Sequence, residues 1–474
     1  MNSLETAGEG ARPRTPVALR RWLFYALMVL ATVAAFLLIR HYGETLAAPA
    51  ASGGGPSARI VGSRNEALLH LLFALAAVIA VGQVLARLFA YLSQPPVIGE
   101  MIAGILLGPS LIGEKASALI LPGSVAPYLS VVAQLGVILY MFTVGLELDA
   151  GLLRNRAHAT VATSHASILA PFLLGCLLAL FLYPRFSNSS VPFTSFALFL
   201  GLAMSITAFP VLARILTDRN MSRTDLGIIA LTCAAVDDVT AWCLLALVVG
   251  VTRAEVGGAL LVPVWSLLFI LVMFLVVRPV VKRLASRWEG ERVPRETVAL
   301  ILVALLVSTM ATELIGIHAI FGAFLLGAVI PHDSAIARSF IRQLEHIVAV
   351  LFLPAFFAYT GMRTRIDLVS GWNQWLICAI IILVATVGKF GGSAIAARLT
   401  GLDWRMSAAL GTLMNTRGLM ELVVLNVGLD LKVISPTLFS MMVLMALVTT
   451  IATSPVLRLL KPPTDAVAPG AEGS

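Results

Sequence analysis

The chain has 474 residues, of which 59% are hydrophobic and 12% are charged, and its mean hydropathy is +0.95. Soluble domains carry about 25% charged residues, so this composition excludes a soluble globular protein and indicates a polytopic membrane protein in a lipid bilayer. The formal net charge of +8 does not indicate a nucleic-acid partner, because the basic residues lie in short loops between apolar runs, where they set membrane orientation.

Apolar runs predict about fourteen membrane-spanning helices, since a span takes roughly 20 residues. The shortest run, at 317–331, falls below that length. The runs lie near residues 21–40, 66–91, 96–112, 126–148, 157–183, 193–216, 225–250, 258–282, 295–315, 317–331, 347–363, 372–398, 405–428 and 434–459.

The distribution of basic residues predicts an even number of spans with both chain ends in the cytoplasm. With Arg20 and Arg21 inside, alternation places nearly every basic loop on the cytoplasmic side, as the positive-inside rule requires. Two outside loops break the pattern, one with Arg59 and Arg64 and one with Arg363 and Arg365. We expect a multi-pass protein of the plasma membrane, the inner membrane in a bacterium.

The chain divides into five predicted segments. They are a cytoplasmic tail (1–20), an extra N-terminal transmembrane helix (21–41), an external linker (42–65), the main membrane domain (66–460) and a disordered cytoplasmic tail (461–474). The first helix has an alternative interpretation, because two arginines, an apolar run and LAAPAAS resemble a cleaved signal peptide. The run of about 18 residues exceeds the usual 7–15, which favours an uncleaved anchor.

Two spans contain helix breakers. SITAFP (205–210) includes Pro210, which has no N–H, so the carbonyl of Ile206 loses its helical partner. MNTRG (414–418) interrupts a later span with polar residues and a glycine. The two spans run in opposite directions, and each has a long span on either side. Helices in 157–250 and 372–459 therefore predict inverted repeats, typical of secondary transporters.

Adjacent aspartates, Asp237 and Asp238, lie in the middle of the apolar stretch 226–250. An acidic side chain at the centre of a membrane helix costs about 2.5–3.5 kcal/mol. Successive helical residues point about 100° apart, so one aspartate can face an ion pocket while the other reaches a partner. The alternative is a purely structural pair held by hydrogen bonds.

Lys389 is the candidate partner, because it lies near the middle of the span 372–398. Gly388, Gly391 and Gly392 around it predict close helix packing. The alternative is a lysine that lines a lipid-headgroup pocket.

The interrupted spans offer further polar groups. The carbonyl of Ile206 and the hydroxyl of Thr207 are hard oxygen ligands for a cation. Asn415, Arg417 and Glu421 lie on the second interrupted span, where the last two, four residues apart, can form an ion pair. That pair either serves transport or simply fixes the break.

The sequence contains no recognisable motif for a disulfide, a metal site or an enzyme active site. The four cysteines, Cys176, Cys233, Cys243 and Cys378, have no paired spacing and are expected in the core. No Walker loop, HExxH or serine nucleophile elbow occurs. We therefore expect neither an enzyme nor a bound cofactor or resident metal.

Several stretches together resemble the monovalent cation:proton antiporters of the second antiporter family, which have the sodium/hydrogen exchanger fold. They are QPPVIGEMIAGILLGPS (94–110), MFTVGLELD (141–149), AAVDDVTAWCLLA (234–246), GIHAIFGAFLLGAVIP (316–331), VGKFGGSAIAAR around Lys389 and NTRGLMELVVLNVGL (415–429). Plant cation/proton exchangers and their bacterial and fungal relatives are the most similar.

The resemblance implies a homodimer whose protomers each have a dimerisation domain and a mobile core domain. It implies that Asp238 binds the cation or proton, that Asp237 pairs with Lys389, and that the interrupted helices cross. The chain departs from the bacterial exchangers in TAFP, in NTRG and in its extra N-terminal span, which leaves the identity of the cation open.

The expected function is exchange of Na⁺ or K⁺ for H⁺, by competition at a buried aspartate with alternating access, and so pH homeostasis. Two alternatives remain: a transporter of the same fold for another solute, and a cation channel without proton coupling. An intramembrane enzyme would need a nucleophile or metal set that the sequence lacks.

Overall fold

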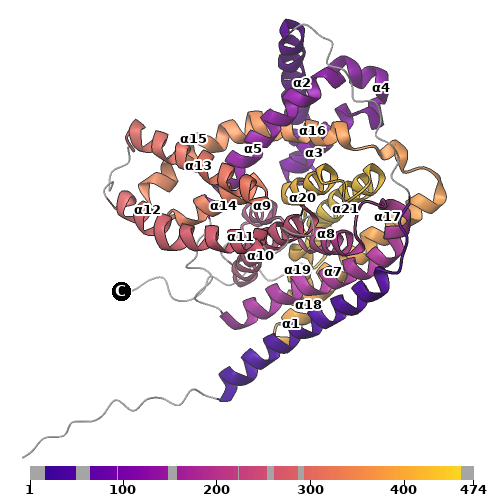
Figure 1. Cartoon of the computed structure of the whole chain (residues 1–474), viewed down its shortest axis with the longest axis vertical. Coiled ribbons are helices and arrows are strands. Elements are labelled where there is room, and N and C mark those ends of the chain that lie inside the picture. The colour runs from indigo at the N-terminus through magenta and orange to yellow at the C-terminus, as the bar shows by residue number, and fades with distance from the viewer. Residues whose placement is uncertain are drawn as a thin grey trace, which may run out of the picture.

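The computed structural model describes residues 16–49, 64–92, 94–147, 157–221, 224–253, 261–286 and 293–460, and within these ranges the regular structure is entirely helical (Figure 1). Most of the external linker expected at 42–65, and most of both expected tails, lie outside the described residues.

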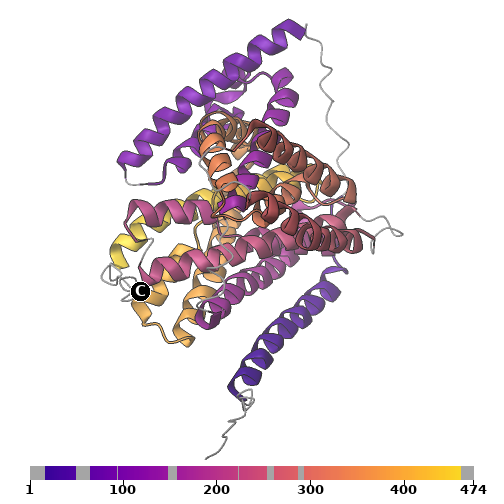
Figure 2. The same cartoon turned by 90° about the vertical axis from the view of Figure 1, so that its left-hand side faces the viewer.

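The first helix, α1 (Pro16–Gly43), begins before the expected boundary at residue 20. It packs against α7 (Ala157–Phe186), where the rings of Phe36 and Phe172 lie 6.2 Å apart. It lies on the opposite side of the molecule from α2 (Arg64–Tyr91) in both views (Figure 2). The extra N-terminal helix is thus an addition to the periphery of the helix bundle.

The helices pack as two groups, which we call the first and second helix groups. The first group comprises α2, α3 (Pro96–Leu107), α4 (Pro109–Ile120), α5 (Ala126–Glu147), α11 (Leu261–Val272), α12 (Arg278–Ala285), α13 (Arg295–Ile315), α14 (Ala319–Val329), α15 (Ala335–Ile347) and α16 (Leu353–Arg363). The second group comprises α7, α8 (Phe193–Ser205), α9 (Phe209–Asp218), α10 (Asp225–Arg253), α17 (Gly371–Thr386), α18 (Gly392–Leu399), α19 (Trp404–Met414), α20 (Leu419–Asp430) and α21 (Pro436–Leu460).

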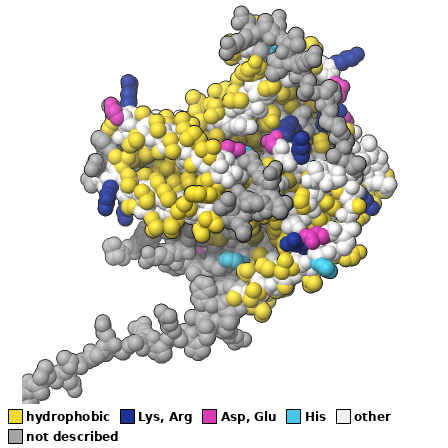
Figure 3. Space-filling model, in the orientation of Figure 1, with side chains coloured by type: hydrophobic (Ala, Val, Ile, Leu, Met, Phe, Trp, Pro, Cys, Tyr) yellow, Lys and Arg dark blue, Asp and Glu magenta, His cyan; other side chains and the backbone are white. Residues whose placement is uncertain are grey.

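Glycines bring α3 and α16 of the first group into close contact. A Cβ on Gly104 would overlap the backbone carbonyl of Phe357 in α16, and one on Gly108 would overlap that of Gly361. Outside these contacts the surface is apolar, and hydrophobic side chains cover much of the face over α11 and α13 (Figure 3). Such a surface suits contact with lipid chains rather than water.

The second group contains two broken spans that cross each other. α8 and α9 are separated by extended residues 206–208, and α19 and α20 by residues 415–418. The backbone N–H of Ala208 donates to the carbonyl of Thr416 over 3.0 Å, so the two breaks touch. The interrupted, crossing helices predicted from SITAFP and MNTRG are confirmed.

The expected count of fourteen spans is not confirmed. By length and composition, the described residues contain 11 helices able to cross a membrane, or 12 if α3 and α4 form one span bent by 64°. Each predicted run contains helix among its described residues, but α3 alone, α14 and the broken pair α19–α20 are not among the 11 helices. In α19–α20, the break that takes part in the crossing thus also divides a predicted span into two short helices.

The cysteines follow the prediction with one exception. Cys176, Cys233 and Cys378 are buried thiols, whereas Cys243 is an exposed thiol on α10. An apolar residue is common both on the core face and on the outer face of a membrane helix, so hydropathy alone did not separate Cys243 from the core cysteines.

Candidate functional site

Asp237 and Asp238 lie on α10 and are 1% and 2% exposed. Helix α10 packs against α7, α8 and α19. The crossing of the broken helices therefore lies beside the two aspartates, at the centre of the second helix group.

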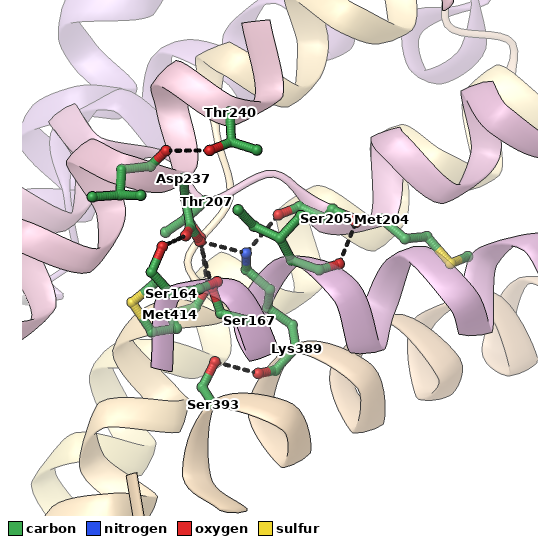
Figure 4. Close-up of polar contacts among 12 residues, drawn as sticks. Ser164, Ser167, Met204, Ser205, Thr207, Asp237, Thr240, Lys389, Ser393 and Met414 are labelled. Carbon is green, nitrogen blue, oxygen red and sulfur yellow. Dashed lines mark hydrogen bonds and ion pairs between the residues drawn. The ribbon is translucent and has the colours of Figure 1, made fainter. Parts of the chain in front are cut away.

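Asp237 is saturated with donors. Its Oδ1 accepts from the hydroxyl of Ser164 at 2.8 Å, and its Oδ2 accepts from the hydroxyls of Ser167 at 2.7 Å and Thr207 at 2.9 Å (Figure 4). Lys389 Nζ lies 2.8 Å from the same Oδ2 in an ion pair with no exposed side-chain surface. Both oxygens of Asp237 are thus satisfied, and its side chain is held in one position by donors from α7, the first break and the turn that carries Lys389.

Lys389 reaches this site because its helix comes very close to α7. It lies in a π-helical turn, Val387–Gly391, between α17 and α18, and such turns often occur at functional sites. A Cβ on Gly388 would crowd the backbone of Pro171 in α7. The close packing predicted from the glycines is therefore present, although Gly391 faces open space.

The ammonium group also closes the end of α8. Lys389 Nζ donates to the carbonyl of Ser205, the last residue of that helix, at 2.5 Å (Figure 4). The C-terminal end of a helix carries unpaired carbonyls and a partial negative charge. Lys389 therefore contacts two negative groups, one side chain and one helix end.

Asp238 has the opposite environment. Both of its carboxylate oxygens are buried and lack a hydrogen-bond partner among the described residues. Further buried oxygens on helices of the second group or at their ends also lack a partner among the described residues, including the hydroxyls of Thr163 and Ser407, Oδ1 of Asn415 and Oε1 of Glu421. A buried carboxylate without a donor is costly unless a proton or a cation neutralises it. The carboxylate of Asp238 therefore offers two hard oxygen ligands to a small cation.

Arg417 and Glu421 form a second buried pair, 3.0 Å apart and without exposed side-chain surface. Arg417 also donates to the carbonyls of Ala203 at 3.0 Å and Met204 at 2.7 Å. It thus crosses from one break to the other and satisfies carbonyls at the end of α8. Arg417 Nε and Glu421 Oε1 have no hydrogen-bond partner among the described residues, so both roles predicted for the pair, in transport and in fixing the break, stay predictions.

The break in the first span begins earlier than Pro210 alone predicts. Helix α8 ends at Ser205, and Pro210 occupies the first turn of α9, where proline is tolerated. The carbonyls of Ala203, Met204 and Ser205 accept from Arg417 and Lys389. Cationic side chains thus occupy the freed helix end that we expected to offer carbonyl ligands near Ile206.

Sequence reasoning missed Ser164 and Ser167. They are three residues apart on α7 and therefore lie on one face of that helix. The sequence feature that could have indicated them is a pair of polar residues at i and i+3 within an apolar span. Serines in membrane helices also bond through their hydroxyls to the preceding turn of their own helix, so this feature does not by itself indicate a site. Only the packing of α7 against α10 distinguishes the two cases.

Comparison with known proteins places the chain in a sequence family. Residues 71–459 match the family model described as "Sodium/hydrogen exchanger, transmembrane". The Na(+)/H(+) antiporter NhaS4 of Synechocystis sp. is 42% identical over 404 residues, which cover 84% of this chain and 98% of that protein. Cation/H(+) antiporter 20 of Arabidopsis thaliana is 40% identical, over 84% of this chain and 49% of its own length.

K(+)/H(+) antiporter 1 of Saccharomyces cerevisiae is 34% identical over 79% of this chain and 44% of its own length. The chain thus spans about half the length of these plant and yeast relatives. Among solved structures, the sodium proton antiporter MjNhaP1 of Methanocaldococcus jannaschii has a TM-score of 0.64, with 84% of this chain and 100% of that chain covered. Its sequence identity of 13% makes this a likeness of fold.

Proposed function

The chain belongs to the sodium/hydrogen exchanger family, and from this premise we propose that it exchanges a monovalent cation, Na⁺ or K⁺, for H⁺ across a membrane, with Asp238 as the exchanging group. Relatives named as Na(+)/H(+) and K(+)/H(+) antiporters support the substrate class.

The contrast between two neighbouring aspartates carries the assignment of the site. Asp237 accepts from three hydroxyls and an ammonium group. Asp238, one residue later on the same helix, has two buried oxygens with no donor among the described residues. Asp237 is therefore held in place, whereas Asp238 is available to a proton or a dehydrated cation.

Competition at Asp238 couples the two fluxes. A carboxylate oxygen that binds a proton loses its charge and with it the attraction for an alkali cation. Because both ligands neutralise the same buried charge, the loaded site is cheaper to move across the membrane than the empty one. Exchange follows if only loaded forms change their access from one side to the other.

The two helix groups supply a geometry for that movement. We propose that the second group is the mobile core domain and that the first group belongs to a dimerisation domain in a homodimer at the plasma membrane. The ligands of the site, the crossing and the Asp237–Lys389 pair all lie in the second group, so they would move as one unit.

Lys389 provides a hypothesis for the exchange ratio. If Lys389 loses a proton when a cation recruits Asp237, more than one proton moves for each cation. The charge moved per cation in vesicles decides this, and a ratio of one proton per cation in the wild-type chain would exclude it.

The central experiment measures exchange in proteoliposomes with Na⁺, K⁺ and Li⁺ over a series of pH values. Asp238→Asn keeps the size of the side chain but removes the exchangeable charge, so cation-driven proton flux should fall to the level of empty vesicles. Asp333→Asn is the matched control, because Asp333 lies exposed in the turn before α15. This control should exchange at the wild-type rate.

Undiminished exchange by folded Asp238→Asn would overturn the assignment of the site. Cation flux that ignores the proton gradient would instead indicate a channel. The fold of the variant is checked by its thermal unfolding, which should match or exceed that of the wild type because a buried unpaired carboxylate has been removed.

A further inference from the structure

A basic pocket lies between the two helix groups, away from the aspartates. It has a volume of about 460 Å³, within the range of about 300–1,000 Å³ typical of ligand pockets. The first helix group contributes the turn between α2 and α3, with Gln94 and Pro95. The second group contributes α9 and α21, whose lining residues are Arg214, Ile215, Arg219, Ser454 and Arg458.

Three arginines line this pocket, and none of its described lining residues is acidic. Burial and then the positive charge of Arg458 hold the pKa of Arg219 below its usual range. Arg219 donates to a carbonyl, that of Ser454, at 2.9 Å. Two guanidinium groups held near each other repel, and an anion between them would relieve this repulsion.

The position of the pocket is that of a membrane–water boundary. It adjoins the ends of α2, α9 and α21, which the charge distribution places on the cytoplasmic side. Beside it, α2 exposes Val84 by 63%, Leu88 by 50% and Tyr91 by 87%. An exposed apolar strip that ends in a tyrosine is typical of a helix in contact with acyl chains and headgroups.

We propose that this pocket binds the phosphate group of an anionic phospholipid, whose acyl chains lie along the exposed face of α2. Arg219 and Arg458 contact the phosphate from the second helix group. Guanidinium groups suit this ligand because their planar donors match phosphate oxygens. Basic pockets between membrane helices are recognised sites for anionic headgroups.

The bound lipid would bridge the two groups. Gln94 Nε2 already donates from the turn of the first group to the carbonyl of Ile451 in α21, at 3.2 Å. A phosphate on Arg219 and Arg458, with acyl chains on α2, would add a second link at the same place. A ligand that binds one arrangement of two units more tightly favours that arrangement. The lipid would thus stabilise the arrangement described above.

The test measures thermal unfolding of the purified full chain in detergent with added phosphatidylglycerol or zwitterionic phosphatidylcholine. Phosphatidylglycerol should raise the unfolding temperature of the wild type, and native mass spectrometry should detect retained lipid. Arg458→Gln should weaken the apparent affinity about fivefold, the factor that corresponds to one arginine near an anionic headgroup. Arg283→Gln, at an exposed site on α12, is the matched control and should respond as the wild type does.

A second arm identifies the source of the phosphate. Inorganic phosphate and glycerol 3-phosphate should give no comparable rise, because they lack acyl chains. Equal protection by these soluble ions would overturn the assignment to a lipid. An unchanged response of Arg458→Gln to phosphatidylglycerol would overturn the site itself. The readout is binding, so the result does not depend on whether exchange occurs at Asp238.

Discussion

Replacing Lys389 by methionine tests how the central ion pair supports the fold. Methionine keeps the unbranched stem and its packing but removes the charge and all three donors. The substitution leaves Asp237 with the hydroxyls of Ser164, Ser167 and Thr207. It also leaves the carbonyl of Ser205, at the end of α8, without the donor that now satisfies it.

The expected cost follows from the burial of the pair. The two charged atoms are 2.8 Å apart, and neither side chain has exposed surface. Removing one partner of a buried pair typically costs about 3–5 kcal/mol, because an uncompensated charge remains. We expect a value near the lower end, about 3 kcal/mol, because three hydroxyl donors continue to stabilise the carboxylate.

The assay is reversible unfolding in mixed micelles, carried out as a double-mutant cycle. Asp237→Asn in the Lys389→Met background removes the orphaned charge and keeps the shape of the side chain. The double variant should therefore recover a large part of the lost free energy of unfolding. Ser393→Ala is the control for a change near Lys389. The Ser393 hydroxyl donates to the backbone carbonyl of Lys389 at 2.7 Å and not to the carboxylate of Asp237.

Two results would refute this reasoning. Lys389→Met with the stability of the wild type would mean that the pair contributes nothing to the fold. A double variant less stable than Lys389→Met would mean that the carboxylate of Asp237 stabilises the fold even without its lysine. Either result would assign the burial of Asp237 to its hydroxyl partners alone.

Three further predictions test other parts of the structure, each by unfolding in the same micelles. Arg417→Lys keeps the charge but loses the planar guanidinium that reaches two carbonyls of α8. The free energy of unfolding should therefore fall by about 1–3 kcal/mol. A variant as stable as the wild type would contradict the bridging role of Arg417. Gly104→Ala places a methyl group against the backbone of α16, so the free energy of unfolding should fall by about 1–3 kcal/mol. Gly391→Ala, which adds a methyl group in open space, is the control and should leave stability unchanged. Equal effects of the two variants would argue against the packing of α3 on α16. Ser167→Ala removes one donor from the buried carboxylate and should cost about 1.5–3 kcal/mol, so a neutral result would show that the remaining donors suffice.

The number of spans was the feature of the fold that hydropathy predicted least well. Apolar composition identifies which residues avoid water, but a helix crosses a bilayer only if it is also long and continuous. In α19 and α20, residues 415–418 interrupt the helix, so a run counted as one span consists of two half-helices. The same breakers that signal a transporter in the sequence therefore make its spans hard to count.

Ser164 and Ser167 show a second limit of prediction from the sequence. Asp237 and Lys389 are conspicuous in a sequence because charges are rare in membrane helices. Ser164 and Ser167 are not, although they contribute two of the four donors to Asp237. A hydroxyl satisfied by its own helix and one satisfied across a helix contact have the same sequence signature.

The sequence by itself determined that the chain is helical and membrane-embedded, where two of its spans are broken, and which charged residues must be buried. Charges and helix breakers are costly in an apolar helix whatever packs beside it, so they can be recognised without the tertiary structure. Only the tertiary structure decided how those charges are shared. It placed Lys389 against Asp237 and the end of α8, and Arg417 against Glu421 and the same helix end. It left the oxygens of Asp238 without a donor among the described residues. The physical reason is that hydrogen bonds act over about 3 Å, and contacts at that distance between residues far apart in the chain depend on how the helices pack.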